Sequence, residues 1–210
     1  MLKHLETSAS LAGCEEGVCD TWGFPIYRTA YGGETDRHWE TLLQTIHQQV
    51  SEELETQQRL ENESEWRRGN PEAASKLLPL FRLESFSDRD LLENAGFDRL
   101  RQMYNENRDN LPAKYTPERF HLFFVADAEV FKALARGDSW VKIVNPRYRP
   151  DDFVVKNRRM RRGLWFLGYM WMTTASLLYL WNWLENRELE LIASRLLYNQ
   201  RLIEVWNGVL

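Results

Sequence analysis

The chain has 210 residues, of which 28% are charged and 43% are apolar. This mixture excludes a collagenous, a disordered or a disulfide-scaffold protein, and the length suffices for one domain with a sizeable core. The net charge of −4 argues against a protein that coats nucleic acid. Nine tryptophans are the most unusual feature of the composition. None of these quantities points to a particular reaction.

The first 20 residues predict a flexible arm, and residues 21–210 predict a single α+β domain. The arm has neither the apolar run of a secretory signal nor the composition of a mitochondrial presequence, so we expect an intracellular, cytoplasmic protein. Cys14 and Cys19 are close enough for a disulfide, but two free thiols are the simpler interpretation. No further Cys pair or spaced His pair completes a zinc site. We predict no metal and no cofactor.

Alternating residues predict a first strand over residues 21–29. Because proline cannot donate to a strand ladder, Pro25 predicts that this strand lies at a sheet edge or carries a bulge. A long helix is predicted from Thr35 or Asp36, with an apolar face that reaches Leu54. A solvated polar extension and a loop are expected to follow it.

Two further strand–helix units come next in the sequence. The strands are predicted at residues 80–86 and 120–125, and Asp88 and Asp127 are predicted to cap the helices behind them. The helix after Asp88 is expected to continue to about residue 107. The strand at 120–125 is apolar on both faces and is therefore expected at the centre of the sheet.

A fourth strand is predicted at residues 140–144, and residues 164–205 are predicted to be helical with a break near Asn186. The fold class is thus α+β, with a mixed four-stranded sheet packed against helices and a long aromatic-rich C-terminal helical unit. Residues 164–184 carry no charge and are long enough to span a membrane. Their polar residues and the need to cover the sheet favour a core helix, so membrane insertion is not expected.

Two motifs and a middle block, residues 123–144, stand out along the chain. The motifs are Trp22-Gly23-Phe24-x-Ile26-Tyr27-Arg28-Thr29-x-Tyr31-Gly32 and Trp171-Met172-x-x-Ala175-Ser176 with Leu177, Leu180 and Trp181 behind it. Together they resemble a large group of uncharacterised proteins of filamentous fungi. The resemblance covers most of residues 21–184 and implies a soluble fungal protein, but no mechanism. The chain departs from the group in its long tail after Leu184.

Arg28 is the first candidate binding residue, because it points to the inward face of the first strand. A guanidinium in that position must be paired or must hold an anion. With Tyr27 and Tyr31 beside it at a glycine turn, Arg28 predicts an anion clamp with aromatic walls for a carboxylate or phosphate. Lys142 could join this arrangement. An internal salt bridge of Arg28 is the simpler interpretation.

The aromatic stripe from Trp165 to Trp183, which includes Trp171, predicts a core helix, the wall of a hydrophobic pocket or a dimer face. His121 is the candidate catalytic residue, as a general base on an apolar strand, although a structural histidine is the simpler interpretation. The sequence holds no phosphate-binding loop, dinucleotide fingerprint, metalloprotease motif or nucleophile elbow.

Residues 142–162 form a basic cluster with eight Lys or Arg against two Asp, a net charge of 8 − 2 = +6. Such a cluster could meet phosphate backbones or an anionic membrane surface. A solvated loop balanced by the acidic residues of 52–65 is the simpler interpretation. Its few aromatic residues give little support to base stacking, so nucleic acid is not an expected partner.

The leading hypothesis is a soluble protein with a pocket for a small, largely apolar ligand that carries an anionic group. The aromatic stripe would line this pocket, Arg28 and Tyr31 would gate it, and any reaction would be isomerase- or cyclase-like. The alternative is a non-enzymatic interaction module that forms a homo-oligomer through the aromatic helix. A weaker alternative is a membrane-associated protein that uses the basic cluster.

Overall fold

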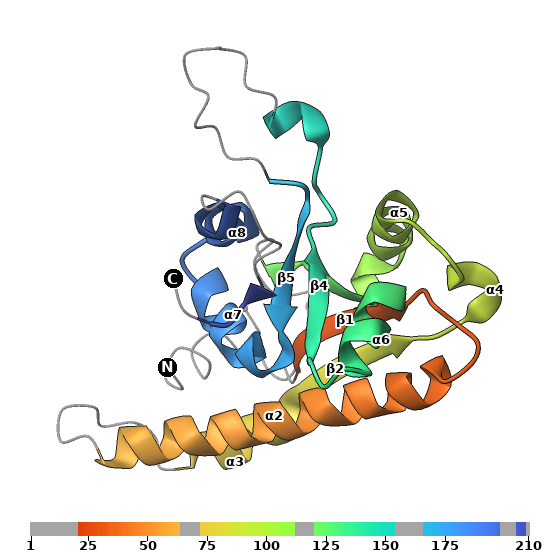
Figure 1. Ribbon diagram of the computed structural model, residues 1–210. Helices are drawn as coiled ribbons and strands as arrows, with labels where there is room; N and C mark the ends of the chain where they lie inside the picture. The colour runs from red at the N-terminus through yellow and green to blue at the C-terminus, as the bar shows by residue number, and fades with distance from the viewer. Residues whose placement is uncertain (1–20, 64–71, 112–119, 154–165, 198–204, 209–210) are drawn as a thin grey trace.

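The computed structural model describes residues 21–63, 72–111, 120–153, 166–197 and 205–208. A mixed sheet of six strands, in the order β2-β1-β3-β4-β5-β6, forms the centre of this part (Figure 1). All strands point the same way except β4, which is antiparallel to both of its neighbours. The strands are β1 (Trp22–Arg28), β2 (Phe81–Phe86), β3 (Phe123–Ala126), β4 (Trp140–Val144), β5 (Tyr169–Thr173) and β6 (Val205–Trp206).

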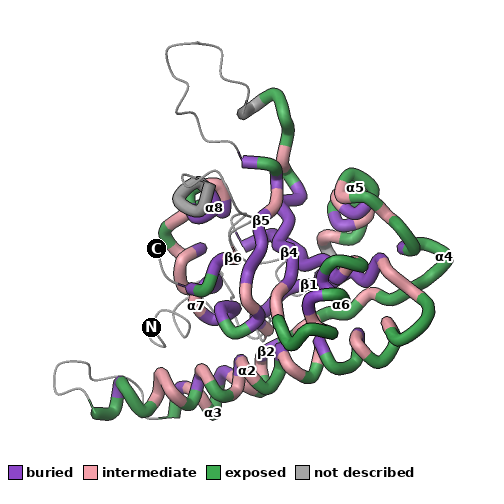
Figure 2. The backbone as a smooth tube through the Cα atoms, in the orientation of Figure 1, coloured by how far each residue is buried: buried purple, intermediate pink, exposed green. Residues whose placement is uncertain are grey.

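Helices cover both faces of the sheet. The described helices are α2 (Thr35–Glu63), α3 (Ala73–Leu77), α4 (Arg89–Leu92), α5 (Phe97–Asn107), α6 (Ala128–Leu134), α7 (Leu177–Leu184) and α8 (Leu189–Leu197). The first face, which carries Phe24 and Phe124, packs against α2, α6 and α7. The second face, which carries Tyr27 and Phe123, packs against α4 and α5. Figure 2 shows the buried backbone concentrated along the strands and the exposed residues on the outer sides of α2, α4 and α5.

The predicted α+β class is corrected to a mixed α/β arrangement, since parallel pairs dominate the sheet and helices connect its strands. The four predicted strands are present as β1 to β4, and β3 is central as expected. The predicted sheet of four strands is wrong, because β5 and β6 extend it beyond β4. The predicted arm, residues 1–20, and with it Cys14 and Cys19, lies outside the described residues.

The C-terminal part is the largest correction. Residues 169–173 form strand β5 instead of a helix, and two short helices and β6 follow it. An uncharged apolar run fits a buried strand as well as a buried helix, so its composition does not separate the two. The residue before β5 departs from helical geometry: Gly168 has a φ of +80°, and a Cβ there would lie 2.4 Å from the Tyr148 ring. No helix of the described residues is both long and apolar enough to cross a membrane.

The edge position predicted from Pro25 is wrong, because β1 lies inside the sheet between β2 and β3. The Thr29 N–H donates to the Ala126 carbonyl of β3 at 3.0 Å. Backbone groups alternate along a strand, so the nitrogen of Pro25 faces the same side as that of Thr29. Pairing of β1 with β3 covers only Ile26 to Arg28. The missing N–H of Pro25 therefore falls before the β1–β3 ladder begins.

The helix ends follow the predicted caps more closely than the predicted lengths. Asp88 Oδ1 accepts hydrogen bonds from the Asp90 and Leu91 amides, and Asp127 caps α6 in the same way. The helix expected from Asp88 to residue 107 is two helices, α4 and α5, because Asn94 between them has a φ of 58°. In contrast, α2 continues to Glu63, through most of the extension that follows Leu54.

Candidate functional site

The strand order places a crevice where the chain changes direction. From β1 the chain passes to β2 on one side, and from β2 it crosses to β3 on the other side of β1. In open α/β sheets, such a switch point leaves a crevice at the carboxyl ends of the strands, where ligands bind. A cavity of about 340 Å³ lies at this position. Its lining residues are Thr29, Ala30, Asn94, Ala95, Gly96, Phe97, Val125, Asp127, Ala128 and Glu129.

The loop between α4 and α5 forms one wall of this crevice. Asn94 is the one non-glycine residue with a positive φ in the described part of the chain. Its N–H donates to the Thr29 carbonyl at 2.9 Å, which ties the loop to the end of β1. A left-handed residue costs free energy and persists where its surroundings fix it, often at ligand sites. The crevice wall is therefore held in one conformation by the sheet.

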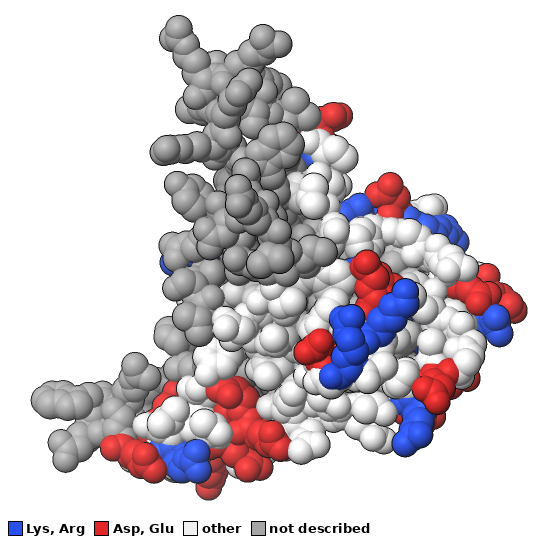
Figure 3. Space-filling model, in the orientation of Figure 1, with Lys and Arg blue, Asp and Glu red and all other residues white. Residues whose placement is uncertain are grey.

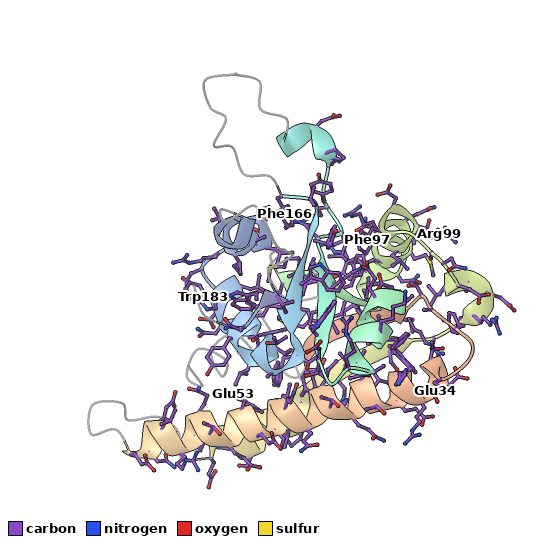
Figure 4. The ribbon with its side chains drawn as sticks, in the orientation of Figure 1. Glu34, Glu53, Phe97, Arg99, Phe166 and Trp183 are labelled. Atoms are coloured by element: carbon purple, nitrogen blue, oxygen red, sulfur yellow. The ribbon has the colours of Figure 1, made fainter. Side chains whose placement is uncertain are left out.

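The same loop presents the N-terminus of α5 to the crevice. Gly96 is the N-cap residue and has no side chain to cap the helix, and among the described residues no other side chain accepts a hydrogen bond from its first amides. The first helical bond runs from the Leu100 N–H to the Gly96 carbonyl at 3.1 Å. Open amides and the positive end of the helix dipole favour an anion at this position. In Figure 4, Phe97 lies on the side of α5 toward the sheet, whereas Arg99 points away from it.

Thr29 supplies a second polar group at the end of β1. Its side chain lines the crevice and the residue is only 5% exposed. Both of its backbone groups are bonded, the N–H to Ala126 and the carbonyl to Asn94. Its hydroxyl makes no hydrogen bond with any other residue that the structure describes. A hydroxyl can both donate and accept a hydrogen bond, so this group can serve a ligand in the crevice.

The opposite wall is acidic and contains a buried lysine. The Lys142 ammonium, whose side chain is 8% exposed, donates to Asp127 and to Glu129 Oε2, the latter at 2.6 Å. The ammonium also lies 4.3 Å from the centre of the Trp171 ring on β5. Two carboxylates and one ammonium leave this wall with a charge of −1. Glu129 is the more exposed of the two acids, at 63% of its side chain.

Trp171 supports this acidic wall instead of lining the crevice. It is 6% exposed, and its ring meets that of Trp140 edge to face at 4.1 Å. Register pairs Trp171 directly with Lys142, so the indole holds the ammonium from the neighbouring strand. Lys142 and Trp171 were named separately as binding residues, and the structure places them side by side, with Trp171 on strand β5 instead of the predicted helix.

Arg28 is paired within the chain. Its guanidinium donates to Asp36, to Thr35 Oγ1 at 2.8 Å and to the Ala30 carbonyl at 2.9 Å. It also lies 4.4 Å from the centre of the Tyr31 ring. These contacts join the end of β1 to the start of α2 on the first face of the sheet. Arg28 and the crevice therefore share one edge of the sheet but lie on opposite faces.

The other predicted site residues are dispersed. Tyr31 stays beside Arg28, donates to its carbonyl at 3.0 Å, and burial raises the pKa of its hydroxyl. Tyr27 lies on the second face, stacked on Phe86, where burial raises its pKa to about 12. His121 is buried before β3 begins, at the end of that strand opposite to the crevice. The structure does not bring His121 and Arg28 together.

The basic cluster is divided by the fold. Lys142 points inward, and Arg147 lies 3.9 Å from Glu188, while residues 154–162 fall outside the described residues. Over α6, basic and acidic side chains lie side by side, and acidic side chains gather over the far end of α2 (Figure 3). Within the described ranges, no group of three or more His, Cys, Asp or Glu side chains is arranged to hold a metal ion.

Sequence reasoning missed the residues that build the crevice: Thr29, Asn94, Gly96 and Glu129. One signal was available, since Asp127 and Glu129 directly follow a buried strand, where parallel sheets place their ligand sites. The parallel direction of β1, β2 and β3 is a long-range property, and without it the strand ends could not be grouped.

The comparisons with known proteins add no relative. No family model, no curated protein and no solved structure matches the chain. The fold and the crevice define the class: a mixed α/β protein with a cavity at the switch point of its sheet.

Proposed function

We propose that the protein binds, in the crevice at the carboxyl ends of β1 and β3, a small molecule that carries an anionic group. The observation that supports this most directly is the uncapped N-terminus of α5 at the crevice. Helix starts usually receive a hydrogen bond from a Ser, Thr, Asp or Asn side chain. Here Gly96 leaves the amides open beside a cavity large enough for a small ligand. A phosphate or carboxylate group of the ligand would accept hydrogen bonds from them.

The rest of the ligand is defined by the other walls. Ala30, Ala95, Phe97 and Val125 offer an apolar surface to its body. The acidic wall of Asp127 and Glu129 favours a hydroxyl or amino group, because carboxylates accept hydrogen bonds from both. The expected ligand therefore has an anionic group at one end, a hydrogen-bond donor at the other and a small apolar part between them.

We extend this proposal to a reaction in the same crevice, because the carboxylate of Glu129 lies at its wall. Its partly exposed carboxylate at the crevice can take a proton from a bound molecule and return it elsewhere, which is the chemistry of an isomerase or cyclase. Lys142 holds that carboxylate through Oε2. Proton transfer in the crevice is thus assigned to Glu129 and not to His121, which lies at the other end of β3.

The anion site can be tested by a substitution that supplies the missing cap. Gly96 has the extended backbone of an N-cap residue, and a Cβ there meets nothing within 4 Å. In Gly96→Asp, the new carboxylate would bond the open amides and repel an anion, while the helix keeps or gains stability. Binding of inorganic phosphate, followed through the amide NMR shifts of residues 96–99, is expected in the parent chain and lost in this variant.

Gly96→Ser is the matched control, because its hydroxyl caps the amides without adding a charge. It should weaken phosphate binding less than Gly96→Asp. If phosphate bound all three chains equally, the anion would not lie at α5 and the proposal would be wrong. Native mass spectrometry of the protein from its own cytosol then identifies the ligand. A co-purified small molecule supports the pocket, whereas protein that carries none, whatever its oligomeric state, counts against it.

A further inference from the structure

β2 is an outer strand of the sheet and pairs with β1 alone among the described strands. Along it Arg82, Glu84 and Ser85 are exposed, and it contains no proline and no lysine. Proteins usually protect a long outer strand with proline, with charged side chains (above all lysine), with a bulge or with a covering segment, because its free backbone groups can pair with another chain. The two charged side chains of β2, Arg82 and Glu84, have opposite signs and so do not repel a second copy. The exposed edge of β2 is therefore a candidate interaction surface.

Gly23 shows which backbone groups of β2 face outward. A Cβ on Gly23 would lie 1.9 Å from the Arg82 carbonyl oxygen, so that carbonyl points toward β1. Because backbone groups alternate along a strand, the N–H and carbonyl of Leu83 and of Ser85 point away from β1. The outer edge of β2 thus presents donors and acceptors at Leu83 and Ser85.

The side chains of β2 are complementary to themselves. If a second copy pairs antiparallel with Leu83 opposite its own counterpart, the two Leu83 residues exchange backbone hydrogen bonds. Arg82 then lies opposite Glu84 of the second copy, and Glu84 opposite Arg82 of that copy. These form the closer, non-hydrogen-bonded pairs of an antiparallel ladder, in which opposite charges attract. A two-fold axis through Leu83 satisfies both ion pairs at once.

We propose that two copies of this chain associate through β2, which joins their sheets edge to edge. Arg82 now donates to the Pro79 and Phe81 carbonyls at 3.0 Å, along the edge that the second copy would occupy. On association it exchanges these bonds for Glu84 of the other copy, and Ser85 pairs with Phe81. This surface is independent of the crevice, and it replaces the aromatic helix as the interface, since Trp171 and Trp181 are buried.

Charge reversal tests this register. Light scattering across a concentration series should show the mass rising from 25.0 kDa toward twice that value. Arg82→Glu and Glu84→Arg each place like charges opposite one another, and each should weaken association at least tenfold. The double variant Arg82→Glu/Glu84→Arg restores the opposite charges and should recover association. Glu106→Arg, an exposed charge reversal on α5, is the control and should leave the mass unchanged.

Cross-linking tests the two-fold axis directly. In a chain with Cys14→Ser and Cys19→Ser, Leu83→Cys should join two copies rapidly through a disulfide or a short bis-thiol reagent. Ser85→Cys should do so much more slowly, since it lies opposite Phe81 of the other copy. A parent chain that stays at 25.0 kDa at every concentration would overturn the proposal. So would a double variant that associates no better than the single ones.

Discussion

The tryptophan-rich core of the first face and the crevice at the carboxyl ends of β1 and β3 are built in opposite ways. In the core, the Trp181 ring lies within 5.5 Å, centre to centre, of Trp22, Phe24 and Phe120, and the residue is 1% exposed. The crevice is lined mostly by small residues, with one aromatic ring, that of Phe97, and with the polar groups of Thr29, Asn94, Asp127 and Glu129. Large rings fill the space between helices and sheet, whereas a ligand needs space and free polar groups. Aromatic abundance therefore marks the core here, and loop ends mark the site.

Trp181→Ala should give the largest effect on the core side of this comparison. Removing a buried indole leaves a cavity, and such substitutions cost about 3–5 kcal/mol of unfolding free energy. Urea unfolding followed by circular dichroism measures the loss. Trp181→Phe is the control: the indole N–H has no partner among the described residues, so losing it breaks no hydrogen bond, and the smaller volume removed should give a clearly smaller loss than in Trp181→Ala. Equal losses in both variants would contradict this packing account.

The second face allows a test by pH. Burial raises the pKa of Tyr27 to about 12 from its ordinary value of 10. The folded state therefore disfavours the ionised phenol, and Tyr27 contributes stability below pH 10 that is lost as pH rises through 12. The loss should be about 2 kcal/mol relative to Tyr27→Phe, which cannot ionise. Unfolding free energies of both chains between pH 9 and 12 measure the difference. Parallel pH profiles would show that Tyr27 is not buried.

The sequence predicted the first half of the fold well because its signals are local. Strands β1 to β4 alternate or are continuously apolar, and Asp88 and Asp127 are caps that act within three residues. The second half depends on distant contacts. Tyr169 to Thr173 is a strand because β4 lies beside it, and nothing within the segment itself separates this outcome from a helix.

The site was harder to predict than the fold for the same reason. Lys142 and Trp171 were singled out individually, and Arg28 was expected inside the sheet, but their partners come from other elements. No sequence pattern marks Asn94 and Gly96 as site residues, because they reach the crevice only through the hydrogen bond that ties their loop to Thr29. The grouping of these residues requires the strand order, which alternation and capping do not specify.

Asp36→Asn should have a smaller effect than either core substitution. Asp36 pairs with Arg28 but its side chain is 76% exposed, so solvent screens most of the ion pair. It also lies in the first turn of α2, where a negative charge is favourable. The expected loss is about 1 kcal/mol, and it should diminish in 1 M salt. Thermal unfolding at two salt concentrations measures it, with the neighbouring Glu34→Gln as control. A loss above about 2 kcal/mol that does not depend on salt would show that the Arg28–Asp36 ion pair is shielded from solvent, as a core contact is.

Thr29→Val should have the smallest effect on the free energy of unfolding. It therefore separates most clearly a residue that serves ligand binding from one that serves the core. Valine keeps the shape of threonine, and the hydroxyl bonds no described residue, so the unfolding free energy should change by less than about 0.5 kcal/mol. Phosphate binding should still weaken about three- to tenfold, because the lost hydroxyl would donate to the anion. NMR titration and urea unfolding of the same samples give both quantities. A large loss of stability with unchanged binding would make Thr29 a core residue, and the division between core and crevice would fail at this position.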